Sequence, residues 1–115
     1  MNKIEENCLF CRIAQGLIKK QKIAETNNFI AILDIKNHYL IIPKKHFVTI
    51  LDIPNNLGEE LLTFSKQLAS KILDNKQGDG FNILMNNLKP AGQIINHASI
   101  ILIPRKENDR LRIIS

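Results

Sequence analysis

Two cysteines, Cys8 and Cys11, form a Cys-x-x-Cys motif near the start of the chain, and the 115 residues contain no other cysteine. Residues three apart on a helix point to the same side, so a helix here would present both thiols together. A structural disulfide is disfavoured, because we expect no secretory signal ahead of these two cysteines. The thioredoxin-like pattern that normally surrounds a redox Cys-x-x-Cys is absent. A metal site and a pair of buried free thiols both remain open.

The chain also holds three histidines, His38, His46 and His97. Each stands at the end of a predicted strand, where a side chain can reach a helix packed across the sheet edge. A closed structural zinc site takes four ligands and often uses two cysteines and two histidines. The sequence therefore supplies enough ligands for zinc, but spacing alone does not select which two histidines would serve.

The spacing of apolar residues predicts the elements that would position these groups. A short helix is expected over residues 8–15, ended by Gly16, and a long helix over residues 54–76, with Gly78 as its breaker. The long helix carries one apolar stripe at intervals of three and four residues: Leu57, Leu61, Phe64, Leu68 and Ile72. Strands are predicted at residues 22–25, 28–34, 38–43, 80–86 and 94–105.

The second and third of these strands carry the clearest patterns. Alternation should place Phe29, Ala31 and Leu33 on one face of the sheet and Ile30, Ile32 and Asp34 on the other. Residues 39–42 are all apolar, which is typical of a strand buried on both faces. With a helix before three strands and a long helix before two more, the order indicates an α+β fold with an antiparallel sheet.

Length and motifs limit the alternatives. The chain is short enough for a single domain over residues 1–115, with a core at 8–105 and a tail at 106–115. No GxGxxG or P-loop motif is present, which excludes those two nucleotide-binding folds. No apolar run approaches the roughly 18 residues of a membrane helix. We therefore expect no membrane partner and a cytoplasmic protein.

The formal net charge is +5, with 16 basic and 11 acidic residues. Such a balance can indicate nucleic acid or another polyanion. However, the 20 Ile, 13 Asn and 12 Lys residues all have AT-rich codons, and the basic residues are scattered. The lysine excess is therefore attributed to an AT-rich genome, and we do not expect a nucleic-acid partner. A small anionic ligand such as a nucleotide fits the charge equally well.

Six segments occur in the order seen in the histidine-triad (HIT) family, which the chain resembles from residue 8 to residue 105. They are CLFCRIAQG at 8–16, LDI at 33–35, LIIPKKH at 40–46, GFNILMNN at 80–87, AGQ at 91–93 and IPR at 103–105. The resemblance implies a five-stranded antiparallel sheet and a homodimer in which two sheets join into one of ten strands. It also implies nucleotide binding, since many members hydrolyse or transfer nucleoside monophosphates.

The family's three alternating histidines correspond here to His97, Ser99 and Ile101, counted back from Pro104 and Arg105. In the family the middle histidine attacks the α-phosphate. Ser99 stands in that place, and a serine hydroxyl needs an adjacent base to act as a nucleophile. Ile101 cannot donate a hydrogen bond to a phosphate oxygen. The resemblance therefore predicts a protein that has lost the family's covalent mechanism.

The resemblance also implies ligands for zinc and for a purine nucleotide. In many bacterial members, positions matching Cys8, Cys11, His46 and His97 hold a structural zinc. The positions matching the nucleotide site are Asp34 and Ile35 at the ribose and base, and Asn86, Gly92, Gln93 and Ser99 near the phosphate. The segment after Asp34 lacks about four of the family's residues, and Leu88, Lys89 and Pro90 replace small residues before the AGQ segment.

We therefore expect a zinc-containing HIT homodimer that binds a purine nucleotide without hydrolysing it. Two alternatives stay open at this point. One is an active phosphoramidate or dinucleoside polyphosphate hydrolase that uses Ser99 or water. The other is an interaction protein without a small ligand.

Overall fold

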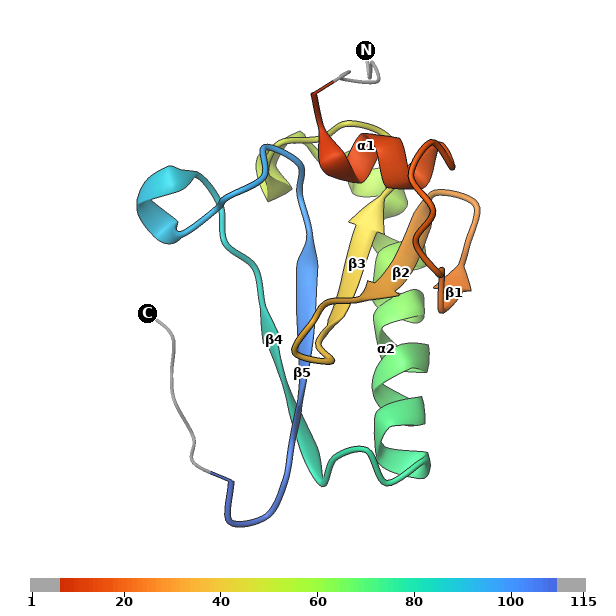
Figure 1. Cartoon of the computed structure of the whole chain (residues 1–115), viewed down its shortest axis with the longest axis vertical. Coiled ribbons are helices and arrows are strands. Elements are labelled where there is room, and N and C mark those ends of the chain that lie inside the picture. The colour runs from red at the N-terminus through yellow and green to blue at the C-terminus, as the bar shows by residue number, and fades with distance from the viewer. Residues whose placement is uncertain (1–6, 110–115) are drawn as a thin grey trace.

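The computed structural model of the chain, described here for residues 7–109, is a five-stranded antiparallel sheet with a helix on each face (Figure 1). The strands lie in the order β1-β2-β3-β5-β4. The elements are α1 (Leu9–Ala14), β1 (Ala24–Glu25), β2 (Phe29–Leu33), β3 (Tyr39–Pro43), α2 (Gly58–Asp74), β4 (Gly80–Leu84) and β5 (Ile100–Arg105). Three short 3-10 turns, η1 (Ile50–Asp52), η2 (Asn55–Leu57) and η3 (Lys89–Ala91), lie between them.

The alternation predicted for β2 is confirmed, because its two faces belong to different clusters of the core. Phe29 and Ala31 are buried against α2, whereas Ile30 and Ile32 are buried against α1. β3 divides in the same way, with Tyr39 and Ile41 toward α2 and Ile42 toward α1. The sheet is therefore the middle layer of the molecule, and α1 holds the Cys-x-x-Cys motif against one of its faces.

The predicted stripe of α2 is also confirmed: Phe64, Leu68 and Ile72 are buried, and Leu57 and Leu61 pack beside them. The prediction that Gly78 ends this helix is wrong. The chain leaves the helix at Asn75, and Lys76 takes the left-handed conformation with φ of 57°. Gly78 serves close packing instead, since a Cβ there would lie 2.9 Å from the carbonyl oxygen of Gly80.

The last strand is shorter than predicted. β5 begins at Ile100, and the predicted strand start at residue 94 is wrong, because the backbone of residues 94–99 forms a local hydrogen bond and one to a loop instead of pairing with a strand. The Ala98 N–H donates to the Phe47 carbonyl at 2.6 Å, and the His97 N–H donates to the Ile95 carbonyl at 2.7 Å. His97 and Ser99 therefore lie in an irregular segment before β5, and Ile101 lies within the strand.

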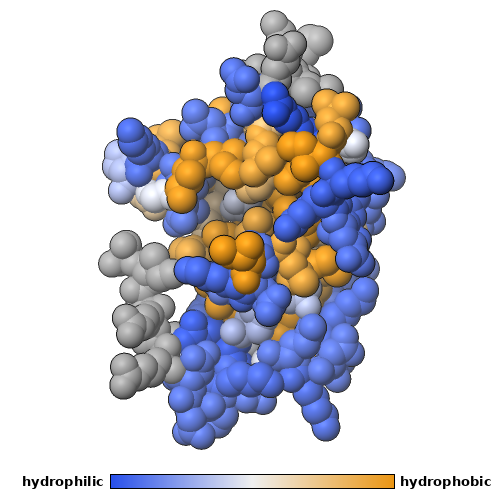
Figure 2. Space-filling view, in the orientation of Figure 1, coloured by the Kyte–Doolittle hydropathy of each residue, from blue (hydrophilic) through white to orange (hydrophobic). Residues whose placement is uncertain are grey.

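Within residues 7–109, no helix is both long and apolar enough to cross a membrane. Figure 2 shows that apolar surface gathers around α1 on the face viewed, whereas the opposite end of the same face is largely hydrophilic.

Candidate functional site

Cys8, Cys11, His46 and His97 converge on one point, with their ligand atoms all within 4.8 Å of one another. Cys8 is the N-cap of α1, and its sulfur accepts the backbone N–H of Cys11 at 3.3 Å. His46 follows β3 and His97 precedes β5, so the cluster joins three separate parts of the fold. The structure thus brings together the two histidines that the family resemblance selected, His46 and His97, and leaves His38 outside the cluster.

The separations within this Cys/His cluster suit a four-coordinate metal. The Cys8 sulfur lies 3.2 Å from Nδ1 of His97. The Cys11 sulfur lies 3.2 Å from Nδ1 of His46 and 3.4 Å from Nδ1 of His97. Zinc bonds of about 2.3 Å to sulfur and about 2.0 Å to nitrogen, at tetrahedral angles, would separate such atoms by about 3.5 Å. Two thiols and two imidazoles are also a donor set that zinc prefers.

His97 is prepared to act as a ligand through Nδ1. Its Nε2 lies 2.7 Å from the Pro43 carbonyl, so the proton sits on Nε2 and the Nδ1 lone pair faces the thiols. Burial lowers the pKa of His97 to about 4, with a smaller lowering by His46 and an opposing effect of the Pro43 hydrogen bond. The imidazole is therefore neutral near pH 7, which metal ligation requires. A surface cavity of about 340 Å³ reaches Cys8 and His46 and provides an entry path.

A second cavity, of about 180 Å³, lies beside this cluster and is lined by all four of the predicted phosphate-side residues. Asn86, Gly92, Gln93 and Ser99 line it, together with Phe10, Leu40, Ile94, Ile95 and Ile101. Phe10 also packs edge-on against the His97 ring, with 5.7 Å between centroids. We call this space the Ser99 pocket.

Gln93 has a structural task that the sequence did not reveal. Its Oε1 accepts the Leu88 N–H at 2.6 Å, and its Nε2 donates to the Val48 carbonyl at 2.6 Å. Both polar ends of the amide are thus used to fasten the β4–β5 connection to the segment after β3. Asn86 remains in the pocket wall, and Gly92, with φ of 97°, occupies a conformation that favours glycine.

Asp34 and Ile35 do not line the Ser99 pocket. The Asp34 carboxylate accepts the backbone N–H groups of Lys36 at 2.8 Å and His38 at 2.9 Å, and it lies 3.4 Å from Nδ1 of His38. Ile35 is 96% exposed. Because Asp34 follows Ile32 by two residues, it belongs to the pocket side of the sheet, at the far end of β2. A ligand that contacts both sites must extend along this face. His38, one of the three histidines that the sequence offers as zinc ligands, contacts Asp34 instead, and its spacing of four residues from Asp34 was a signal for this pair.

The three triad positions have separate surroundings. Nδ1 of His97 faces the thiols and its Nε2 binds Pro43, so neither nitrogen is available to Ser99. The Ser99 hydroxyl makes no hydrogen bond to any residue between 7 and 109. Ile101 pairs with Leu40 in the sheet and presents an aliphatic side chain to the pocket. This arrangement offers Ser99 no base.

Comparison with known proteins agrees with this fold. The family model described as the HIT domain matches residues 15–108. The chain belongs to the HIT family. This HIT protein is 37% identical over 108 residues to an uncharacterized HIT-like protein of Methanocaldococcus jannaschii, covering 89% of this chain and 81% of the relative.

Two further relatives carry informative descriptions. An adenosine 5′-monophosphoramidase of Candida albicans is 36% identical over 109 residues, covering 88% of this chain and 72% of the relative. The crystal structure of a Zn-bound histidine triad family protein from Mycobacterium smegmatis superimposes with a TM-score of 0.84 at 32% identity, covering 93% of this chain and 81% of that one. The predicted α+β fold is thereby confirmed, and one neighbour of the same fold is described as Zn-bound.

Proposed function

We propose that this HIT protein is a homodimer, stabilised by zinc, that binds a purine nucleotide and does not hydrolyse it. One observation carries the proposal. Ser99 stands where the family pattern places its nucleophilic imidazole, and the neighbouring His97 is fully engaged by Pro43 and the two thiols.

Zinc is the proposed occupant of the Cys/His cluster. Cys8, Cys11, His46 and His97 would hold it, and the Zn-bound relative supports this choice of metal. Bound zinc would supply a cross-link between α1, the segment after β3 and the segment before β5, and a closed four-ligand site is structural. Two thiols that are not joined in a disulfide also suit the reducing cytoplasm, which we propose as the compartment.

The nucleotide is proposed from the relatives and from the Ser99 pocket. The similar C. albicans protein acts on an adenosine monophosphate derivative, as its name states. In this chain Asn86 and Ser99 offer polar groups to a phosphate, while Phe10 and Leu40 supply apolar wall. Asp34, on the same side of the sheet, can accept hydrogen bonds from ribose hydroxyls.

We infer the loss of hydrolysis from two features: within the described part of the chain Ser99 has no general base within hydrogen-bond distance, and Ile101 offers no hydrogen-bond donor to a phosphate. A general base must lie about 2.6–3.2 Å from the hydroxyl that it deprotonates. No nitrogen or carboxylate within residues 7–109 forms such a hydrogen bond with Ser99. Ile101 removes a donor that would stabilise charge on the phosphate in the transition state.

The dimer is proposed from exposed apolar groups at the free edge of the sheet. β4 is an edge strand, and Phe81 and Ile83 on it are 37% and 59% exposed. Leu62 and Leu73 of α2 are also exposed, at 57% and 42%. An unpaired apolar edge is a ready template for another strand. A second copy pairing β4 with β4 would continue the sheet to ten strands.

Isothermal titration calorimetry with AMP tests the binding half of the proposal. We expect saturable binding to the wild-type protein and weaker binding to Asn86→Ala, which loses a wall group of the Ser99 pocket. Asn56→Ala is the matched control, because Asn56 is an exposed residue of η2 that does not line the pocket. Equal weakening by both variants, or no heat of binding to the wild-type protein, would contradict the proposal.

A further inference from the structure

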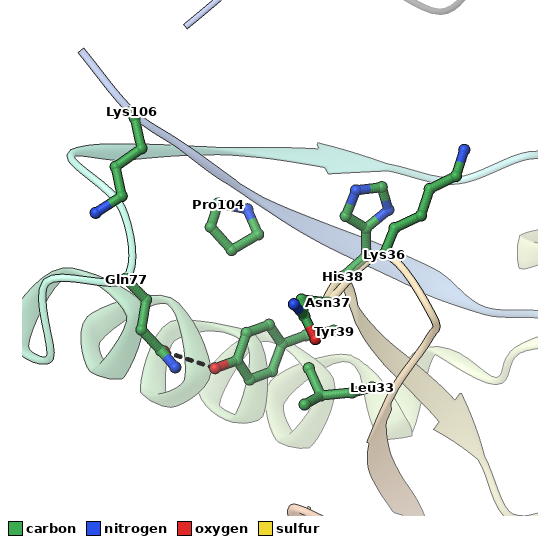
Figure 3. Close-up of a pocket in the computed structure, with 8 residues that line it drawn as sticks. All are labelled: Leu33, Lys36, Asn37, His38, Tyr39, Gln77, Pro104 and Lys106. Carbon is green, nitrogen blue, oxygen red and sulfur yellow. Dashed lines mark hydrogen bonds between the residues drawn. The ribbon is translucent and has the colours of Figure 1, made fainter.

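A cavity of about 540 Å³ lies on the opposite side of the sheet from the Ser99 pocket and shares no residue with it (Figure 3). Its volume is within the range of small-molecule sites. The residues that line it are Leu33, Lys36, Asn37, His38, Tyr39, Gln77, Pro104 and Lys106. We call it the Tyr39 cavity.

The floor of the Tyr39 cavity is apolar and rigid. Leu33 and Tyr39 are paired between β2 and β3, and Pro104 follows on β5 two residues after Leu102, the β5 partner of Tyr39. Alternation along these strands puts all three on the α2 side of the sheet. Tyr39 is 7% exposed, and its hydroxyl donates to Oε1 of Gln77 at 2.6 Å. The floor is thus a fixed aromatic and aliphatic surface at the end of the sheet.

The rim of the cavity is basic and offers hydrogen-bond donors. Since Oε1 of Gln77 accepts from Tyr39, the amide NH₂ of Gln77 is turned away from that bond. Lys106 is held nearby by a hydrogen bond of 2.9 Å from its ammonium to the Lys76 carbonyl, which leaves two of its N–H donors. Figure 3 shows Lys106 and Gln77 at one end, and Lys36 and His38 at the other, with Pro104 between.

The positive charge of the rim favours an anionic ligand. Among residues 7–109, two lysines line the Tyr39 cavity and no carboxylate does. The nearest acidic group to the rim histidine, Asp34, is engaged by Nδ1 of His38 and by two backbone N–H groups. An apolar floor with cationic ends and amide donors is complementary to a planar organic anion.

We propose that the Tyr39 cavity is a second ligand site, which takes a small molecule with a planar apolar body and one carboxylate or phosphate group. The body lies on Leu33, Tyr39 and Pro104, and the anionic group meets the Lys106 ammonium and the Gln77 amide. This site shares no residue with the Cys/His cluster or with the Ser99 pocket.

Titration of the ¹⁵N-labelled full chain, followed by NMR, tests the proposal. The probes are benzoate and phenyl phosphate, which each carry a planar ring and an anionic group. Inorganic phosphate, which has the charge without the ring, and benzyl alcohol, which has the ring without the charge, are the controls. For probes of this size we expect dissociation constants of about 1–10 mM. The expected shifts fall at Asn37, Gln77 and Lys106, and the tighter of the two anions identifies the preferred head group. Benzyl alcohol binding as tightly as benzoate would overturn the role of charge.

Two lysine variants make the test specific. Lys106→Gln should weaken the binding of benzoate or phenyl phosphate about threefold to fivefold, as expected for the loss of an exposed ion pair. The loss of affinity should be larger at low salt than at high salt, because salt screens exposed charges. Lys66→Gln is the matched control, because Lys66 is exposed on α2 and does not line the cavity. Equal weakening by both variants, shifts only around Asn86 and Ser99, or no shift at about 10 mM probe would overturn the second site. AMP binding at the Ser99 pocket is measured separately, so either proposal can fail alone.

Discussion

Replacing Cys11 by serine should remove most of the stability that zinc gives to the fold. The Cys11 side chain is 1% exposed, and its sulfur lies within 3.4 Å of two imidazoles that are 35 and 86 residues away in the chain. Binding to the folded state alone stabilises it by about 2.7–4.1 kcal/mol when free zinc is 100–1,000 times the dissociation constant. At about 4 °C per kcal/mol for a domain of this size, the melting temperature should fall by about 11–16 °C.

The assay is thermal unfolding of wild type and Cys11→Ser, each with and without a chelator, alongside metal analysis by mass spectrometry. Chelation should lower the melting temperature of the wild-type protein and leave that of Cys11→Ser almost unchanged. In the presence of chelator the two proteins should unfold within about 1 kcal/mol of each other, because the serine hydroxyl can donate a hydrogen bond to an imidazole nitrogen that the Cys11 sulfur contacts. A wild-type protein that loses its metal without losing stability, or a variant that keeps one zinc per chain, would refute the reasoning.

Three further predictions follow from other parts of the structure. In the metal-free protein, the pKa of His97 is about 4 in the folded state and about 6.5 in the unfolded state. Between these values the unfolded state binds more protons, so the free energy of unfolding should fall by about 3 kcal/mol as the pH drops from 6.5 to 4. A free energy of unfolding from urea denaturation that stays constant over this pH range would contradict the prediction. Ile83→Lys at the β4 edge should convert a dimer of twice 13.1 kDa into a monomer in sedimentation, whereas Ile35→Lys, at a 96% exposed position outside that edge, should leave the dimer intact. Gln93→Ala removes two hydrogen bonds of 2.6 Å, so it should lower the free energy of unfolding by about 1–3 kcal/mol and weaken the binding of AMP. An unchanged urea denaturation curve would show that this amide is not needed to hold the loop.

The sequence predicted the features that depend on local periodicity. Alternation in β2 assigned Phe29 and Ile30 to opposite faces, and the intervals in α2 identified Phe64 and Leu68 as core residues. These patterns hold because each side chain's direction is set by the backbone of its own element. The resemblance to the HIT family also identified the two histidines that complete the Cys/His cluster.

Features that depend on distant partners were predicted less well. Residues 94–99 have the composition of a strand, but they do not pair with a neighbouring strand. Instead, the Ala98 N–H bonds to the Phe47 carbonyl and the His97 side chain bonds to the Pro43 carbonyl, both from distant parts of the chain. Gln93 lines the Ser99 pocket, but the sequence did not reveal that both ends of its amide bind backbone groups up to 45 residues away. The end of α2 carried no local signal, because the left-handed residue that follows its C-cap is Lys76 and glycine is the residue that normally takes this conformation.

The most direct test of the central claim is the turnover of adenosine 5′-phosphoramidate by zinc-loaded wild-type protein and by the double variant Ser99→His with Ile101→His. Wild type should hydrolyse the substrate no faster than background, since removal of a nucleophile can cost on the order of a millionfold in rate. The double variant restores the imidazoles beside a pocket that keeps Asn86 and Gly92, and should gain measurable activity. Turnover by wild type near 1 per second, within the ordinary range of enzymes, would contradict the claim that Ser99 marks a lost active site.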